Sequence, residues 1–337
     1  MELSEKLQNK LDSLTKPQGS LGELEKTALK LGLIQNRVDP VIDNKSTIVF
    51  AGDHGVVKHG VSAFPKEVTV QMVLNFLNNG AAINVLSKYV NSKVFVVDAG
   101  VDFDFDDNCG VIKNKILNGT GDLYKDKAMT VDEAKKNIEL GKEITKKIIS
   151  ENKIDMIALG EMGIGNTTPA TILISKICGL DYDSATGRGT GINDEGLNIK
   201  KKIIDEVLSN IKEVTEPYEL LSCAGGLEIA QITGAVLACQ ELNVPAVIDG
   251  LICTSGALIA SLINGDTKKI MFAGHKSHEP SHIYALQKLG LKPLLDLDMR
   301  LGEGTGAVLA MNIIEASTKI INEMATFESA GVSNKDE

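Results

Sequence analysis

The feature that most constrains the fold is a short apolar segment that ends in Gly or Asp and leads into a polar, Gly-containing loop. Segment and loop together recur at residues 46–55, 93–100, 154–166, 219–226, 244–250 and 269–278. The apolar runs are continuous rather than alternating, which is typical of strands covered on both faces. Helical patterns lie between them, so the sequence predicts right-handed crossovers and an α/β fold built on a parallel sheet.

Helices are expected between these strands. Thr130 and Glu133 form a capping box at the start of one of them. The expected helices cover residues 66–78, 80–89, 130–149, 166–178, 193–211, 226–240, 251–263 and 281–289. Ligands of open parallel sheets bind beyond the carboxyl ends of the strands, so the six loops are expected to converge on one rim and form the functional site there.

The two ends of the chain do not continue the alternation. Residues 3–30 have a helical pattern that is interrupted at 16–22, and residues 305–324 have one apolar helical stripe. We therefore predict a small helical domain made of residues 1–35 and 305–337, attached to a large α/β domain of residues 36–304. The polar tail, 328–337, is expected to be disordered.

Charge and cysteine usage narrow the function. A net charge of −10 argues against a nucleic-acid partner, because phosphate contacts require a basic face. No apolar run approaches the roughly 20 residues that span a bilayer, and no secretory signal opens the chain. The five cysteines are scattered and contain no C-x-x-C pair, which favours reduced thiols in a cytoplasmic protein.

The segment 274–282 contains the pattern H-E-x-x-H, which is typical of zinc metalloproteases. Proline fits only the first turn of a helix, so Pro280 predicts that His278 and His282 do not share a helical face. A zinc-dependent hydrolase that uses His275, His278 and His282 is one alternative. The other interpretation of this segment is a loop whose polar groups cap the next helix and contact a ligand.

Three further segments have the chemistry of ligand sites. Residues 159–170 and 186–192 are Gly-rich turns ahead of helices, where a backbone can approach an anion closely. Neither contains a complete P-loop or dinucleotide fingerprint, so ordinary tight turns are an alternative. Glu303 lies among three glycines before the C-terminal helix, where it either caps the helix or faces a ligand.

Nine segments together resemble one family, the nicotinate-nucleotide–dimethylbenzimidazole phosphoribosyltransferases of cobalamin lower-ligand assembly. Their order along the chain also matches that family, and the resemblance extends from about residue 14 to about residue 320. The segments are residues 14–25, 50–56, 68–87, 159–170, 187–192, 223–235, 249–260, 274–282 and 295–307.

The resemblance implies a Rossmann-like parallel sheet with a small helical domain, acting as a homodimer without a metal or other cofactor. The implied reaction moves the 5-phosphoribosyl group from nicotinate mononucleotide to 5,6-dimethylbenzimidazole. The products are α-ribazole 5′-phosphate and nicotinate, formed by a single displacement. A non-catalytic nucleotide-binding module with this fold is a further alternative.

The resemblance also implies roles for individual residues. Glu303 would be the general base that removes the benzimidazole proton, and Glu161 a second carboxylate near the ribose. The remaining implied contacts are Gly163, Gly189 and Lys200 for the phosphoribosyl group, Gln71 and Met72 for the benzimidazole, and Ser277, Glu279 and His282 as possible ligand contacts. His278 departs from the family pattern, in which this position holds a small or apolar residue.

Overall fold

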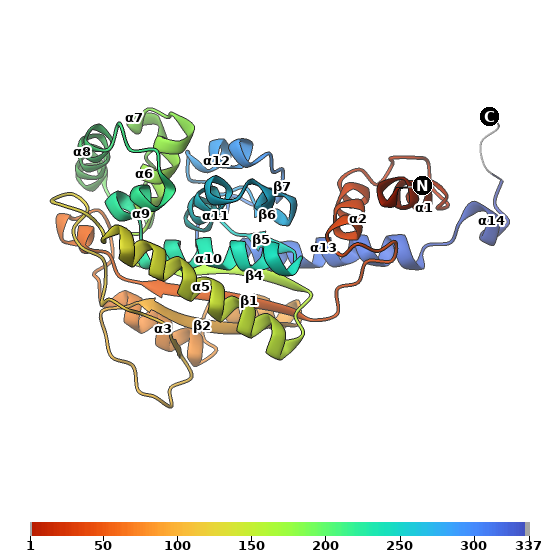
Figure 1. The fold of residues 1–337 in the computed structure, drawn as a ribbon, viewed down its shortest axis with the longest axis horizontal. Helices are drawn as coiled ribbons and strands as arrows, with labels where there is room; N and C mark the ends of the chain where they lie inside the picture. The colour runs from red at the N-terminus through yellow and green to blue at the C-terminus, as the bar shows by residue number, and fades with distance from the viewer. Residues whose placement is uncertain (1, 334–337) are drawn as a thin grey trace.

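A computed structural model describes residues 2–333. In this part of the chain seven strands form one sheet in the order β3-β2-β1-β4-β5-β6-β7, and all neighbouring strands are parallel (Figure 1). The predicted α/β class and parallel sheet are therefore confirmed. The strands are β1 Lys45–Gly52, β2 Ser92–Gly100, β3 Ile112–Lys113, β4 Met156–Met162, β5 Ala246–Ile248, β6 Met271–His275 and β7 Pro293–Leu295.

The eight helices predicted between the strands are all present, with their ends shifted by three residues or fewer. Thr130 and Glu133 form the expected capping box. The helices are α1 Leu3–Asp12, α2 Glu23–Ile34, α3 Val68–Leu77, α4 Ala82–Tyr89, α5 Val131–Asn152, α6 Thr167–Cys178, α7 Tyr182–Ala185, α8 Asp194–Asn210, α9 Pro217–Ala224, α10 Leu227–Leu242, α11 Leu251–Ile263, α12 His282–Leu289, α13 Thr305–Glu323 and α14 Phe327–Ala330.

The strand order reverses direction at the centre of the sheet. From β1 the chain first adds β2 and β3 on one side, and then returns to place β4 on the other side of β1. The connections that leave β1 and β4 therefore run to opposite sides of the sheet, and the carboxyl ends of two such strands are where open parallel sheets bind their ligands. This topology positions the polar loops that follow β1 and β4 beside each other.

Helices cover both faces of the sheet (Figure 1). α5, α10, α11 and α12 lie on one face, and α3, α4 and α13 lie on the other. Every residue of β1 is buried between these layers, as its continuous apolar run predicts. Within residues 2–333 no helix is long and apolar enough to cross a membrane.

One predicted strand is wrong. Residues 219–226 do not join the sheet, because most of them belong to helix α9. Pro217 occupies the first turn of α9, and the Glu216 side chain accepts the Glu219 N–H as a cap. A short buried helix and a buried strand have the same apolar run, so periodicity alone does not separate them. The sequence also missed the short edge strands β3 and β7.

The two ends of the chain pack together around a second, smaller apolar core. Leu7, Leu11 and Ala28 from the N-terminal helices pack against Ile321 near the end of α13, and both helices lie beside that half of α13 (Figure 1). The division into two domains stays a prediction. The tail was predicted to be disordered, but α14 includes residues 328–330, and residues 334–337 lie outside the described residues.

Candidate active site

Two buried carboxyl groups meet at the centre of the rim. Glu161 lies near the end of β4, and Glu303 lies two residues before α13. Their meeting depends on glycines. A Cβ atom on Gly160 would lie 2.3 Å from the Glu303 carbonyl oxygen, and one on Gly302 would lie 2.4 Å from Glu161 Oε1. The contact at Gly160 is with backbone and excludes a larger residue, whereas Gly302 is favoured by its φ of +87°, which larger residues rarely adopt.

Glu303 adopts an unusual backbone conformation. Its φ of +63° lies in the left-handed region, which costs a non-glycine residue roughly 1 kcal/mol. Its side chain reaches α4, where the Ile83 N–H donates to Glu303 Oε2 over 3.2 Å. Burial raises the pKa of Glu303 although this hydrogen bond lowers it. Loss of hydration and the nearby Asp249 carboxyl group therefore outweigh this hydrogen bond, and the pKa, whose direction the sequence left open, is raised.

Glu161 is even more strongly perturbed. Burial raises its pKa to about 8, against the hydrogen bond that the Asn166 amide donates to it. The nearby carboxyl groups of Asp249, Glu228 and Glu303 raise this pKa further. Without bound substrate Glu161 is therefore mostly protonated at neutral pH, whereas the resemblance implied an ionised carboxylate.

The raised pKa of Glu161 predicts that Glu161→Gln stabilises the empty protein. Between about pH 4.5 and about pH 8 the unfolded chain releases a proton that the folded chain keeps, so wild-type stability falls as pH rises. Glutamine removes this cost, and at pH 7.5 we expect a gain on the order of 2 kcal/mol in the free energy of unfolding. Urea unfolding at pH 5.0 and 7.5 measures it, with Glu206→Gln as an exposed control. A variant less stable than wild type at pH 7.5 contradicts the prediction.

A second corner of the site surrounds the buried amine of Lys200. Its Nζ donates to Thr167 Oγ1 over 2.8 Å and to the Gly187 carbonyl over 3.3 Å. Thr167 is the first residue of α6, and Gly189, with a φ of +51°, lies beside both side chains. Burial lowers the pKa of Lys200 to about 8, and the charge of Glu279 opposes that shift. A cation and a helix N-terminus in one corner suit a phosphate group.

Gly163 connects the two parts of the site. It lies between Glu161 and the start of α6, and a Cβ atom there would lie 2.5 Å from the Gly52 carbonyl oxygen. Helix α3 borders the same loop, since Thr69 Oγ1 accepts the Ile164 N–H over 3.1 Å. The two predicted benzimidazole contacts, Gln71 and Met72, lie two and three residues after Thr69 on α3, and they are exposed and half-buried respectively.

The histidine loop is built differently from a zinc site. Helix α12 begins at His282, so His278 lies in the preceding loop, as Pro280 predicts. His282 is fully buried, and both ring nitrogens are hydrogen-bonded, one to the Ser277 N–H at 2.9 Å and one to the Thr254 hydroxyl at 3.0 Å. Burial lowers its pKa to about 3. This geometry makes His282 a structural residue of the loop.

The geometry gives no support to zinc binding by this loop. Across residues 2–333 no three His, Cys, Asp or Glu side chains are arranged to hold a metal ion. Ser277 and Glu279, the other two possible ligand contacts predicted in this loop, are buried. Ser277 Oγ accepts the Glu279 N–H over 3.3 Å, and Glu279 Oε1 accepts the Gly189 N–H over 3.0 Å. Glu279 therefore ties this loop to the corner around Lys200.

Two buried acidic residues beside the carboxyl pair are not among those that the sequence analysis singled out. Asp249 follows β5 and is 1% exposed. Glu228 lies in the first turn of α10, and its Oε1 is 2.7 Å from His54 Nε2. Asp249 directly follows a buried strand, and this position is the sequence signal that could have identified it. Glu228 lies in the first turn of a helix, where acidic residues are common, so no such signal marks it.

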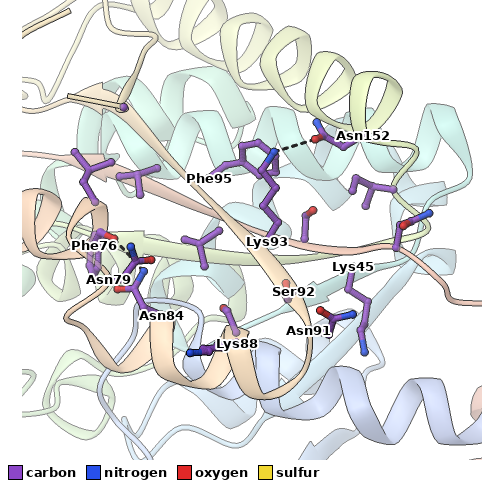
Figure 2. Close-up of a pocket in the computed structure, with 18 of the residues that line it drawn as sticks. Lys45, Phe76, Asn79, Asn84, Lys88, Asn91, Ser92, Lys93, Phe95 and Asn152 are labelled. Atoms are coloured by element: carbon purple, nitrogen blue, oxygen red, sulfur yellow. Dashed lines mark hydrogen bonds between the residues drawn. The ribbon is translucent and has the colours of Figure 1, made fainter. Parts of the chain in front are cut away.

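A groove of about 1500 Å³ lies elsewhere, at the amino ends of β1 and β2 (Figure 2). The Lys93 amine reaches Asn152, and the Asn84 amide reaches the Phe76 carbonyl oxygen within it. Substrates of parallel sheets bind at the opposite ends of the strands, so this groove is separate from the carboxyl pair.

Comparisons with known proteins agree with this fold. The phosphoribosyltransferase family model matches residues 1–332. The nicotinate-nucleotide–dimethylbenzimidazole phosphoribosyltransferase of Geobacter sp. (strain M21) is 48% identical and covers 97% of this chain and 94% of its own length. That of Chlorobaculum tepidum is 45% identical, covering 100% and 96%. The crystal structure of CobT from Thermus thermophilus superposes with a TM-score of 0.96 at 43% identity, covering 99% of this chain and 100% of that one.

The fold and the family match thus define an α/β phosphoribosyltransferase built on a parallel sheet. The similarity extends over nearly the full length of both this chain and its relatives. The chain belongs to the nicotinate-nucleotide–dimethylbenzimidazole phosphoribosyltransferase family.

Proposed function

We propose that this protein transfers the 5-phosphoribosyl group of nicotinate mononucleotide to 5,6-dimethylbenzimidazole. The products are nicotinate and α-ribazole 5′-phosphate, as expected for cobalamin nucleotide-loop assembly. The observation that carries the proposal is the buried pair of Glu161 and Glu303, which lies beside the Lys200 corner in a chain similar to these enzymes over nearly its full length.

The bond changes follow from the charges of the substrates. The donor ring nitrogen is cationic, so when its bond to C1′ breaks, the bonding electrons neutralise it and nicotinate leaves without a proton. One benzimidazole nitrogen attacks C1′ from the opposite face, which converts a β-nucleotide into an α-product. The proton on the other benzimidazole nitrogen goes to Glu303, whose raised pKa brings its proton affinity closer to that of the group it deprotonates.

Glu161 stabilises the positive charge of the ribosyl group as the donor bond breaks. In the empty site it is mostly protonated. The cationic donor ring favours ionisation of a carboxyl group beside it, because an opposite charge lowers a raised pKa. Glu161 therefore becomes the counter-ion only when the donor is bound, which limits the time that an unpaired charge is buried.

The donor phosphate binds in the corner formed by Lys200, Gly189 and Gly163, where Lys200 gives a positive charge and the backbone gives N–H groups. Gln71 and Met72 contact the benzimidazole from α3. Ser277 and Glu279 form one wall, and Glu279 must yield its hydrogen bond with the Gly189 N–H when the phosphate takes that donor.

We also propose that the protein is a cytoplasmic homodimer. It has no nucleic-acid partner in this proposal, because its net charge of −10 disfavours contacts with phosphates. Exposed Val85 and Tyr89 of α4 support a protein partner, and Val85 lines the groove at the amino ends of β1 and β2. Light scattering should give about twice the chain mass of 36.0 kDa, whereas a monomer would contradict the dimer.

The test of the proposed function mixes the purified protein with nicotinate mononucleotide and dimethylbenzimidazole and measures both products by chromatography. Equal amounts of nicotinate and α-ribazole 5′-phosphate are expected. Donor that binds in calorimetry but is never consumed would instead favour a non-catalytic nucleotide-binding protein. Repeating the assay with benzimidazole and adenine as acceptors compares the proposed acceptor with other bases.

A further inference from the structure

The Asp249 side chain, which follows β5, holds the turn after Glu303 by hydrogen bonds. Asp249 Oδ2 accepts the Gly304 N–H over 3.1 Å, and Oδ1 accepts the Ala307 N–H over 2.9 Å. The Gly306 N–H also points at this carboxyl group. The three donors belong to the four residues that immediately follow Glu303, so one buried side chain fixes the start of α13.

His275 supports Asp249 from the next strand. Its Nε2 lies 3.5 Å from Asp249 Oδ1, and it is only 2% exposed. A Cβ atom on Gly306 would lie 2.0 Å from the His275 ring, so the ring packs directly against the turn. The ends of β5 and β6 thus contact the same few residues of α13, and Gly160 of β4 contacts the backbone of Glu303 itself.

Glu303 has a left-handed backbone that a glutamate does not adopt readily on its own. Such a conformation persists only when its surroundings determine it. The hydrogen bonds to Asp249 hold the residues directly after Glu303 and therefore keep the Glu303 backbone in its left-handed conformation. Without these hydrogen bonds the turn can relax to a right-handed conformation, which would point the Glu303 carboxyl group away from its present position.

We propose that Asp249, supported by His275, is a positioning residue that holds Glu303 where it receives the proton of the acceptor base. This inference rests on the proposed function of Glu303. Asp249 itself is 1% exposed and bonded to backbone groups, so it acts through the turn and not on the substrate.

Charge adds an effect that a purely structural residue would not have. The titratable groups that interact with Asp249 are His275 from β6, Glu161 from β4, Cys253 from α11 and Glu303 itself. Burial raises the pKa of Asp249 itself, against His275 and the three backbone N–H groups, which lower it. In its ionised form Asp249 raises the pKa of Glu303 and of Glu161. Removing that charge lowers the pKa of both, while the turn loosens.

The test is Asp249→Asn in the full-length protein, because asparagine keeps the size but offers an N–H group where a backbone N–H now points. We expect kcat to fall about 10- to 100-fold, as small misplacements of catalytic groups do, with less than about a threefold change in KM for the donor. The acid limb of the kcat profile should move to lower pH. Asp296→Asn is the matched control, since Asp296 follows β7 but is exposed and pairs only with Lys276.

A double-mutant cycle with Glu303→Gln decides whether Asp249 acts through Glu303. Non-additive losses in kcat support the inference, and additive losses overturn it while leaving the proposed reaction in place. An unmoved acid limb, or equal effects on kcat and donor KM, also overturns it. If Asp249→Asn fails to fold, His275→Gln serves in the same cycle with the same two outcomes. A wild-type protein that forms no α-ribazole 5′-phosphate overturns the proposed function, and this inference with it.

Discussion

Glu303→Gln should lower kcat by about 10²- to 10³-fold, the usual contribution of a general base, while both substrates still bind. Glutamine keeps an oxygen that can accept the Ile83 N–H, so we expect the side chain to keep its position. What it loses is the ability to take the proton that the attacking benzimidazole must give up. Steady-state kinetics and donor binding by calorimetry measure the two halves of this prediction.

The pH dependence of kcat gives a second test of the role of Glu303. Burial raises the pKa of Glu303, so its base form is lost as pH falls through that raised value, above the usual range for glutamate. Wild type should therefore show an acid limb in kcat that Glu303→Gln lacks. Glu323→Gln, at the exposed end of the same helix, is the control and should behave as wild type. A Glu303→Gln rate within threefold of wild type would remove Glu303 from the base role.

Lys200→Met should raise the donor KM on the order of 10²-fold, with a smaller effect on kcat. A charge-assisted hydrogen bond to phosphate in a buried corner contributes about 1.5–3 kcal/mol, which corresponds to roughly a 10- to 100-fold change in affinity. Methionine fills a volume similar to that of lysine. It also removes the desolvation cost of the fully buried Lys200 amine, which lowers the pKa of that amine to about 8. The variant should therefore fold, and its loss should be in binding.

Lys202→Met is the matched control, because Lys202 lies two residues along α8, is exposed and has only an ion pair with Glu206. Donor affinity of the wild type should also weaken as pH rises through about 8, where the amine of the empty site loses its proton. Calorimetric titration of nicotinate mononucleotide at pH 7 and pH 9 measures this. Equal donor affinity of Lys200→Met and Lys202→Met would contradict the phosphate role.

Much of the fold followed from local patterns. Continuous apolar runs that end in Gly or Asp identified five of the seven strands, and Pro280 correctly predicted that the H-E-x-x-H pattern would not lie on one helix. The failures were also local. Residues 219–226 have the apolar run of a buried strand but form α9, and β3 and β7 are too short to produce a recognisable run.

The ionisation of the site could not be predicted, because it depends on groups that are distant in the chain. Whether burial or a helix end governs Glu303 depends on how completely β4, α4 and the turn after Glu303 exclude water. The same packing keeps Glu161 protonated, with acidic neighbours from α10 and from the end of β5. No pattern around either glutamate carries that information.

The sequence by itself determined the parallel sheet, the rim where its loops gather and the family to which the chain belongs. Periodicity and ordered motifs are properties of neighbouring residues, so they can be recognised before folding is known. Only the tertiary structure decided that Asp249 holds the turn of Glu303 and that His282 is an internal support. Hydrogen bonds and loss of hydration act across space, and the residues that supply them lie on strands brought together only by the folded sheet.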